Sequence, residues 1–365
     1  MKYNLAFKYR IYPNKEQELL INKTFGCVRF IYNTILYTAN KIYEETGKNK
    51  IITPASLKSE NQFLKEVDSL ALSNAQLNVK RSFTNFFQKR AKFPKFKSKK
   101  TSVKSYTTNC VNNSIRIEEN KYLVLPKLKR VKLKYHREIP KNYKIKSVTL
   151  TNSNGNYYVS VLTEFEKEIQ KMPSNDKVIG LDFSMSELFV SSENQRADYP
   201  RYFRILEKKL KELQKSLSRK VKFSKNWYKQ KSKISKLHEY IKNCRRDFLH
   251  KLSKKLSKEY NAVVVEDLNM RGMSQTLNFG KSVGDNGWGM FLKMLEYKLM
   301  FLGKQFLKID KWFQSSKTCS RCGNVKEELK LLERSYKCEC CGIEIDRDYN
   351  AALNIKNIGK AMLEY

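Results

Sequence analysis

The sequence predicts a barrel-like β domain followed by an α/β domain, and three observations indicate this fold class. Two apolar runs, 178–181 and 262–265, are each followed directly by a carboxylate, as buried parallel strands of an α/β sheet can be. Residues 105–165 instead divide into short strands separated by turn residues. Near the end, four cysteines form two C-x-x-C pairs. With 365 residues, the chain has room for two or three such domains.

The first domain begins with a strand. Residues 3–12 alternate loosely between apolar and polar side chains, and the pattern stops at Pro13. Asn14 and Gln17 then form a capping box, which predicts a helix that ends at Gly47.

A second capping box, Ser73 with Gln76, predicts that another helix begins there. Residues 14–99 therefore read as a helical insertion within a barrel-like domain made of residues 1–13 and 100–172. The stretch from Lys167 to Lys177 contains Pro173 and Ser174 and is predicted to be a linker.

Residues 89–104, KRAKFPKFKSKKTSVK, form a basic strip without helical period. Such runs are usually solvated surface. Here Phe93 and Phe96 alternate with lysines around Pro94, which favours contact with a phosphate backbone. The candidate contact residues in this strip are Lys92, Lys95 and Lys97.

The second half alternates strands and helices. We expect a strand, a Ser-rich turn and a second strand in 178–191, then two long basic helices in 203–258 that meet along an apolar seam. An apolar strand at 262–269 leads into a glycine-rich stretch, 271–289, which is predicted to be a mobile loop. The remaining elements expected before the cysteines are a helix at 290–302 and a strand at 305–309.

The cysteines have the spacing of a zinc ribbon. Cys319 and Cys322 form one C-x-x-C, Cys338 and Cys341 form the other, and 15 residues separate the pairs. Four thiolates satisfy the tetrahedral shell of Zn²⁺ and leave no open position, so one structural zinc is expected. Disulfides are disfavoured because no export signal is evident. Cys340 could replace one ligand, although the regular spacing is preferred.

The charge balance predicts a nucleic-acid partner. The chain carries 73 Lys and Arg against 36 Asp and Glu, a formal charge of +37, which a polyanion would neutralise. The 21 Tyr and 20 Phe residues exceed the usual needs of a core, leaving some to stack on bases. A membrane-surface protein is the alternative. No apolar span approaches ~20 residues and no signal peptide is evident, so a soluble, reducing compartment is expected.

Carboxylates follow both buried runs. If the two strands are neighbours, Asp182 and Glu266 lie side by side at the carboxyl ends of the strands, where α/β sheets bind ligands. A third acid from the helix that begins near DRDYNAA would complete a site for Mg²⁺ or Mn²⁺. Two such ions, roughly 3.5–4 Å apart, support phosphodiester cleavage. Each acid taken singly could be a cap or a surface charge.

The chain resembles the TnpB proteins of bacterial insertion sequences, RNA-guided DNA nucleases related to type V CRISPR effectors. The resemblance is carried by FKYRIYPN, SNAQLNVKRSFTNFF, KFPKFK, IGLDFS, RRDFLHKLS, VVVEDLNMRGM, SSKTCSRCG and DRDYNAALNI. It implies a RuvC-type, RNase H-like domain over 173–314 and 346–365, interrupted by a zinc ribbon at 315–345. It also implies that the first domain is a wedge-like β-barrel that carries a helical recognition insertion.

The resemblance also implies residue roles. Asp182, Glu266 and Asp348 match the catalytic positions of the family, with Asp346 held in reserve. Gln76 falls in the helix that faces the short DNA motif beside the target. Many relatives have a glycine where this chain has Ser184, which alters the turn next to the metals without removing a ligand.

The expected activity is RNA-guided, Mg²⁺-dependent DNA cleavage, with a guide RNA encoded by the element and double-stranded target DNA as partners. A monomer in the bacterial cytoplasm, associated with the nucleoid, is favoured. Two alternatives remain open from the sequence: an RNA-guided repressor that does not cleave, and a conventional strand-joining transposase.

Overall fold

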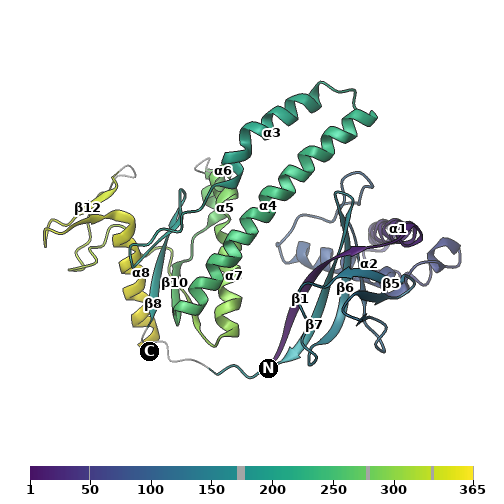
Figure 1. The fold of residues 1–365 in the computed structure, drawn as a ribbon, viewed down its shortest axis with the longest axis horizontal. Helices are drawn as coiled ribbons and strands as arrows, with labels where there is room; N and C mark the ends of the chain where they lie inside the picture. The colour runs from purple at the N-terminus through teal and green to yellow at the C-terminus, as the bar shows by residue number, and fades with distance from the viewer. Residues whose placement is uncertain (49, 171–176, 277–279, 330–332, 365) are drawn as a thin grey trace. The chain divides into compact units, whose positions relative to one another are not determined.

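The computed structural model describes residues 1–48, 50–170, 177–276, 280–329 and 333–364. The chain divides into two compact units, Met1–Glu168 and Ile169–Tyr365 (Figure 1). Residues 171–176 of the expected linker lie outside the described residues. No helix in the described ranges combines the length and the apolar character needed to cross a bilayer.

Unit 1 is built on a seven-stranded antiparallel sheet with the order β2-β6-β7-β1-β5-β4-β3. Its strands are β1 (Lys2–Tyr12), β2 (Lys104–Asn109), β3 (Arg116–Glu118), β4 (Tyr122–Leu125), β5 (Lys129–Lys134), β6 (Lys144–Ser153) and β7 (Asn156–Glu166). The long central strand β1 pairs with β7 on one side and with β5 on the other. No pairing joins β2 to β3 in the described part of this unit, so the expected barrel is an open sheet at that seam.

The first helix of unit 1 follows the sequence closely. α1 (Lys15–Thr46) begins at the predicted capping box, in which Asn14 and Gln17 exchange side-chain to backbone hydrogen bonds of 2.8 and 3.0 Å. It ends at Gly47, whose φ of 68° is the left-handed conformation of a helix C-terminus. The predicted bounds of this helix are confirmed.

The second predicted helix start was wrong. A short 3₁₀ helix, η1 (Gln62–Lys65), comes first. Helix α2 (Ser69–Phe87) follows, and its N-cap residue is Asp68, whose side chain accepts a hydrogen bond from the amide of Leu70. Ser73 lies one turn inside the helix and donates back to the carbonyl of Ser69. The buried residues Ala71, Leu72 and Ala75 anchor this first turn. Burial of the first turn therefore overrode the local capping signal.

Sheet and helices share one core in unit 1. Tyr9 of β1, Ile21 of α1 and Val79 of α2 belong to the same buried cluster and are each almost fully buried. The helical segment is therefore packed on the sheet rather than folded around a core of its own.

Unit 2 contains a four-stranded sheet with the order β11-β10-β8-β9. Its strands are β8 (Val178–Ser184), β9 (Leu188–Ser191), β10 (Ala262–Glu266) and β11 (Gln305–Ile309). β10 is parallel to both β8 and β11, whereas β9 is antiparallel to β8. The chain thus leaves β8 on one side to form β9 and returns on the other side as β10, so the strand order reverses at β8.

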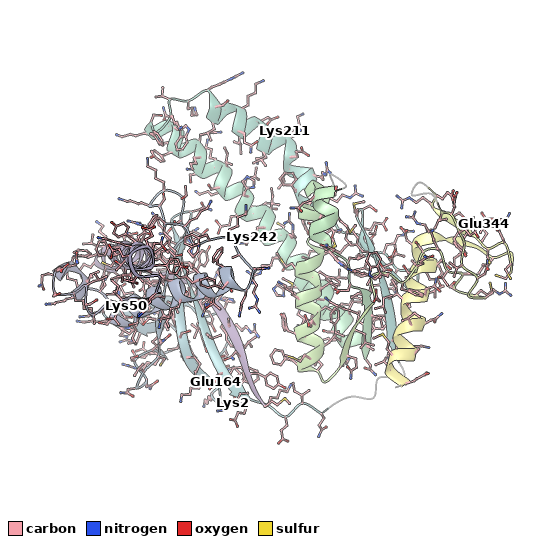
Figure 2. All side chains as sticks on the ribbon, turned by 180° about the vertical axis from the view of Figure 1, so that it is seen from behind. Lys2, Lys50, Glu164, Lys211, Lys242 and Glu344 are labelled. Atoms are coloured by element: carbon pink, nitrogen blue, oxygen red, sulfur yellow. The ribbon has the colours of Figure 1, made fainter. Side chains whose placement is uncertain are left out.

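The helices of unit 2 surround this sheet. They are α3 (Tyr202–Ser218), α4 (Lys225–Glu259), α5 (Met270–Thr276), α6 (Gly280–Asn286), α7 (Trp288–Phe301) and α8 (Arg347–Glu364). α3 and α4 form the predicted basic hairpin, on which Figure 2 labels Lys211 and Lys242. The seam between them includes the buried residues Leu210 and Ile241.

The glycine-rich stretch 271–289 was predicted wrongly as a loop. The structure has two short helices there, α5 and α6, and residues 277–279 between them lie outside the described residues. Tertiary contacts explain the difference. The buried Asp285 accepts hydrogen bonds from the amide of Phe203 and the guanidinium of Arg245, which fix α6 to the base of the hairpin.

Strand alternation sends successive side chains of the sheet into two different cores. Ile179, Leu181, Val263 and Val265 pack in the cluster that contains residues of α4 and α7. Val178, Ala262 and Val264 pack instead with Ile355 of α8. Helix α8 therefore covers the opposite face of β8 and β10 from α4 and α7, and it lies along β8 in Figure 1.

A small cysteine-containing module precedes α8. It includes the two-stranded ribbon β12 (Ser335–Lys337) and β13 (Glu344–Asp346), and β13 leads directly into α8. Its core contains Tyr336, Cys319 and Cys338. Residues 330–332 within the module lie outside the described residues.

Candidate active site and metal centre

Asp182 and Glu266 lie on neighbouring strands at the same edge of the sheet. Leu181 of β8 and Val265 of β10 are register partners, and the two acids are the next residue of each strand. Because side chains alternate between faces, both carboxylates point to the face that carries α8. The predicted adjacency of these two acids is therefore present in the structure.

Asp348 joins them from the first turn of α8. Burial raises the pKa of Asp182 well above its ordinary value, and the nearby charges of Glu266 and Asp348 raise it further, whereas Arg347 opposes the rise. Burial also raises the pKa of Glu266, against a hydrogen bond from Ser315 that lowers it. Three carboxyl groups thus converge on one partly buried region.

Two arginines compensate this negative charge. Arg347 contacts the Asp348 Oδ1 atom through Nη2 at 3.1 Å, and Arg334 lies 3.7 Å from the Oδ2 atom. The side chains of Arg347 and Asp348 are only 15% and 16% exposed, so this pair is shielded from solvent far more than an ordinary surface ion pair.

Asp346 has a different role from Asp348. Its Oδ1 atom accepts a hydrogen bond of 2.9 Å from the amide of Tyr349, which caps α8, and its Oδ2 atom pairs with Arg196 at 3.2 Å. The geometry therefore favours Asp348, rather than Asp346, as the third member of the carboxylate group.

The donor set of this group suits a hard divalent cation, because carboxylate oxygens from three separate elements face one region where the strand order reverses. The carboxylates are spaced more widely than the cysteines. In the described residues, only the cysteine cluster brings three or more candidate ligand atoms within 4.8 Å of one another.

The predicted four cysteines do meet. The Sγ atoms of Cys319 and Cys341 are 3.6 Å apart, as are those of Cys322 and Cys338. A tetrahedral ion with Zn–S bonds of ~2.3 Å would hold its sulfurs about 3.8 Å apart, whereas a disulfide needs ~2.05 Å. The arrangement fits a closed four-sulfur zinc site. Cys340 is exposed and lies outside the cluster.

One cysteine is already suited to ligate a metal as thiolate. The amide of Cys341 donates to the Cys338 sulfur at 3.5 Å, and this hydrogen bond is the main cause that lowers the pKa of Cys338 to about 6. A thiolate at this position supports the structural metal site.

The candidate nucleic-acid residues in unit 1 have unequal surroundings. Lys92 and Lys95 are exposed. The Lys97 ammonium instead lies 3.9 Å from the ring centroid of Tyr32, and its backbone is held by the Asn33 side chain. Gln76 donates its amide to the carbonyl of Ile52, so that nitrogen fixes the loop before α2.

Comparison with protein families matches three parts of the chain. Residues 160–277 match a family described as "Probable transposase", and residues 288–355 match the family "Cas12f1-like, TNB domain". Residues 1–48 match a family described as "Helix-turn-helix domain", although in this structure they form β1 and the single helix α1.

Whole-length relatives extend these matches. The chain is 34% identical to the "Putative RNA-guided DNA endonuclease" of Streptomyces pristinaespiralis, over 98% of this chain and 89% of that protein. It is 33% identical to the "Putative RNA-guided DNA endonuclease InsQ" of Escherichia coli (strain K12), over 100% and 94% of the two chains. The chain belongs to the same family. The resemblance to TnpB proteins that the motifs indicated is thereby confirmed.

The fold of this TnpB family member is also similar to a solved structure. It matches a chain of the "Cryo-EM structure of the Cas12f1-sgRNA-target DNA complex" with a TM-score of 0.61, over 98% of this chain and 99% of that chain. The two sequences are 14% identical, so the likeness concerns the fold alone.

Three residues beside the TnpB carboxylates were assigned no role from the sequence: Ser315, Arg334 and Arg347, although the quoted motifs contain Ser315 and Arg347. Only one signal in the sequence points toward them. Asn350 and Asn354 are amides one turn apart on a helix that is otherwise apolar on its buried side, which indicates a polar segment packed against that helix.

Proposed function

We propose that this protein is an RNA-guided DNA endonuclease that hydrolyses phosphodiester bonds of a target DNA with Mg²⁺ or Mn²⁺ held by Asp182, Glu266 and Asp348. The observation that carries the proposal is the convergence of these three carboxylates on one face of β8 and β10. The whole-length identity to proteins named as such endonucleases supports the same activity.

The two cations would activate water and stabilise the leaving oxygen. The chain's own residues supply the binding site. Asp182 and Glu266 are fixed by the parallel pairing of their strands, and Asp348 is fixed by the first turn of α8. Arg347 and Arg334 place positive charge beside Asp348, and guanidinium groups at this position would also bind phosphate oxygens of the substrate.

The proposal assigns the rest of the chain to nucleic-acid binding and to support of the site. Residues 173–314 and 346–365 form a RuvC-type, RNase H-like domain, and residues 315–345 form a ribbon that holds one structural Zn²⁺. Guide RNA paired to the target would contact the hairpin of α3 and α4, on which lysines crowd both helices. The bacterial cytoplasm, with its DNA, is the expected location.

The test is cleavage of a plasmid that carries the guide-matched sequence by the purified ribonucleoprotein in Mg²⁺. Asp348→Asn should abolish cutting. Asp346→Asn is the matched control, because asparagine still caps α8 and only the pair with Arg196 is lost. Equal cutting by Asp348→Asn and the unaltered protein would refute the site.

The family description "Probable transposase" favours one rival reading, strand joining at element ends. Substrates that carry either the guide match or the element ends separate the two. Cutting that follows the element ends and ignores the guide would establish the rival and reject RNA guidance.

A further inference from the structure

Ser315 connects the carboxylate group to the segment that precedes the cysteine cluster. Only 6% of this residue is exposed, and its hydroxyl donates a hydrogen bond to the Oε1 atom of Glu266. Ser315 follows β11 by a few residues and comes four residues before Cys319. One short stretch of chain thus contacts a candidate metal ligand at one end and carries a cysteine ligand at the other.

That stretch is folded into a turn of its own. The amide and the hydroxyl of Thr318 both donate to the carbonyl oxygen of Gln314, at 3.0 and 2.9 Å. The amide of Lys317 donates to the same carbonyl. We refer to residues 314–318 as the serine turn.

Two buried asparagines hold the serine turn against α8. Asn354 donates to the carbonyl oxygens of Ser315 and Thr318, at 2.8 and 2.7 Å. Asn350 donates to Thr318 at 2.7 Å and accepts from the amide of Ser320 at 3.0 Å. These asparagines are at most 4% exposed, and buried amides are costly unless they are satisfied. The turn therefore has one strongly preferred position.

The cysteine cluster fixes the far end of the turn. Cys319 directly follows Thr318, is almost fully buried, and belongs to the four-sulfur group. An ion bound there would immobilise Cys319 and, through the turn, the hydroxyl that contacts Glu266. Without that ion, the turn would keep its bonds to α8 and those that the Lys317 carbonyl accepts from the Lys326 amide and the Tyr336 hydroxyl, but Cys319 would lose its tie to the other cysteines.

We propose that Ser315 is a positioning residue that sets the orientation of the Glu266 carboxylate, and that the cysteine cluster acts on this orientation through the serine turn. Ser315 occupies Oε1 and leaves Oε2 available to a cation. The inference rests on the proposed function, because it takes Glu266 as a ligand of the divalent cation. Removing a hydrogen bond of this kind costs roughly 10–100-fold in metal affinity.

The experiment measures Mn²⁺ binding to the whole chain by calorimetry. The part of the binding that disappears in Asp182→Asn is assigned to the carboxylate group. Ser315→Ala should weaken this binding by ~10-fold or more. Ser315→Thr retains the hydroxyl and should restore it. Thr318→Val is the matched control, because it removes a hydroxyl from the same turn that bonds only to Gln314.

A second arm tests the link to the cysteines. Cys322→Ser alone should weaken Mn²⁺ binding. In the double variant Ser315→Ala/Cys322→Ser, the affinity should be no lower than in Ser315→Ala, because both changes act through the contact between Ser315 and Glu266. If thermal unfolding shows that Cys322→Ser destroys the cooperative transition, the comparison of Ser315→Ala with Ser315→Thr alone decides whether Ser315 positions Glu266.

Equal Mn²⁺ affinity of Ser315→Ala and the unaltered protein would overturn the positioning role. Fully additive losses in the double variant would overturn the link to the cysteines. If the unaltered protein showed no Mn²⁺ binding that depends on Asp182, the proposed metal site itself would fail, and the inference would fail with it.

Discussion

Gly180 of β8 and Ala352 of α8 approach each other so closely that a Cβ atom on Gly180 would lie 2.3 Å from the Ala352 carbonyl oxygen. The amide nitrogen of Lys356 would be 2.6 Å away, so the obstacle is helix backbone rather than a movable side chain. This contact sets the distance between α8 and the strand that carries Asp182, and hence where Asp348 lies.

Gly180→Ala should therefore displace α8 and destabilise unit 2 by at least ~2 kcal/mol, with loss of cleavage. Thermal unfolding and plasmid cutting measure the two effects. Gly289→Ala is the control, because Gly289 lies in α7 with open space around it and alanine there favours the helix by up to ~1 kcal/mol. Unchanged stability in Gly180→Ala would mean that α8 can shift without cost.

Removal of one cysteine ligand should remove the structural metal. Cys322→Ser is expected to purify with no zinc, whereas Cys340→Ser should retain one ion per chain, because Cys340 is exposed and outside the four-sulfur group. Metal analysis by mass spectrometry measures both. Loss of zinc in Cys340→Ser alone would reassign the ligand set.

Asp182 should make the stability of the protein fall as the pH rises when Mg²⁺ is absent. Its folded pKa is raised above the ordinary 3.8, so the native state binds more protons than the unfolded state above that pH, and ionisation costs folding free energy. Asp182→Asn should raise Tm at pH 7–8, and the gain should shrink toward pH 5. For a unit of this size, each ~1 kcal/mol corresponds to about 2–4 °C. A lower Tm of Asp182→Asn throughout this range would contradict the assignment.

The lysines of the basic strip should differ in their effect on RNA binding. The exposed Lys92 and Lys95, changed together to alanine, should reduce the salt slope of binding by about 2, one per phosphate contact. Lys97→Met should leave the slope unchanged, because its ammonium packs on Tyr32. Binding measured at several salt concentrations tests this. A reduced slope for Lys97→Met would show that Lys97 leaves the ring to bind phosphate.

The ion pair at the base of the hairpin should matter more than those on its surface. Arg245 and Asp285 are 3.1 Å apart and only 19% and 4% exposed, so Asp285→Ala leaves a shielded cation and should cost ~3–5 kcal/mol. Asp247→Ala removes the exposed pair with Lys251 and should cost less than ~1 kcal/mol. Denaturant unfolding compares them, and similar losses would show that burial does not distinguish the pairs.

Local signals in the sequence predicted the parts of the fold that depend on local structure. The capping box at Asn14 and the apolar runs that Asp182 and Glu266 follow are properties of a few neighbouring residues. The start of α2 and the helices α5 and α6 were missed because burial decided them, through Ala71, Ala75 and Asp285, and contacts made far along the chain are not visible in a local pattern.

The carboxylate site was predictable only in part, for the same reason. Asp182 and Glu266 directly follow apolar runs, and Asp348 comes soon after the second C-x-x-C pair, so the sequence itself indicates these three positions. Ser315 begins the SSKTCSRCG motif, but no spacing or apolar run in the sequence assigns it a role beside Glu266. Its contact with Glu266 exists because β11 pairs with β10 and because Asn354 of α8 holds the turn, and both are contacts between segments far apart in the sequence.

The arginines that flank Asp348 place positive charge beside the acidic centre. Arg347 opposes the repulsion between the carboxylates, although burial, Glu266 and Asp348 together raise the pKa of Asp182 by more than Arg347 lowers it. If Asp348 holds a divalent cation as proposed, its Oδ1 atom would have to exchange the contact with the Arg347 guanidinium for one with the metal. A guanidinium that left Asp348 in this way would be placed to bind a phosphate oxygen of the substrate.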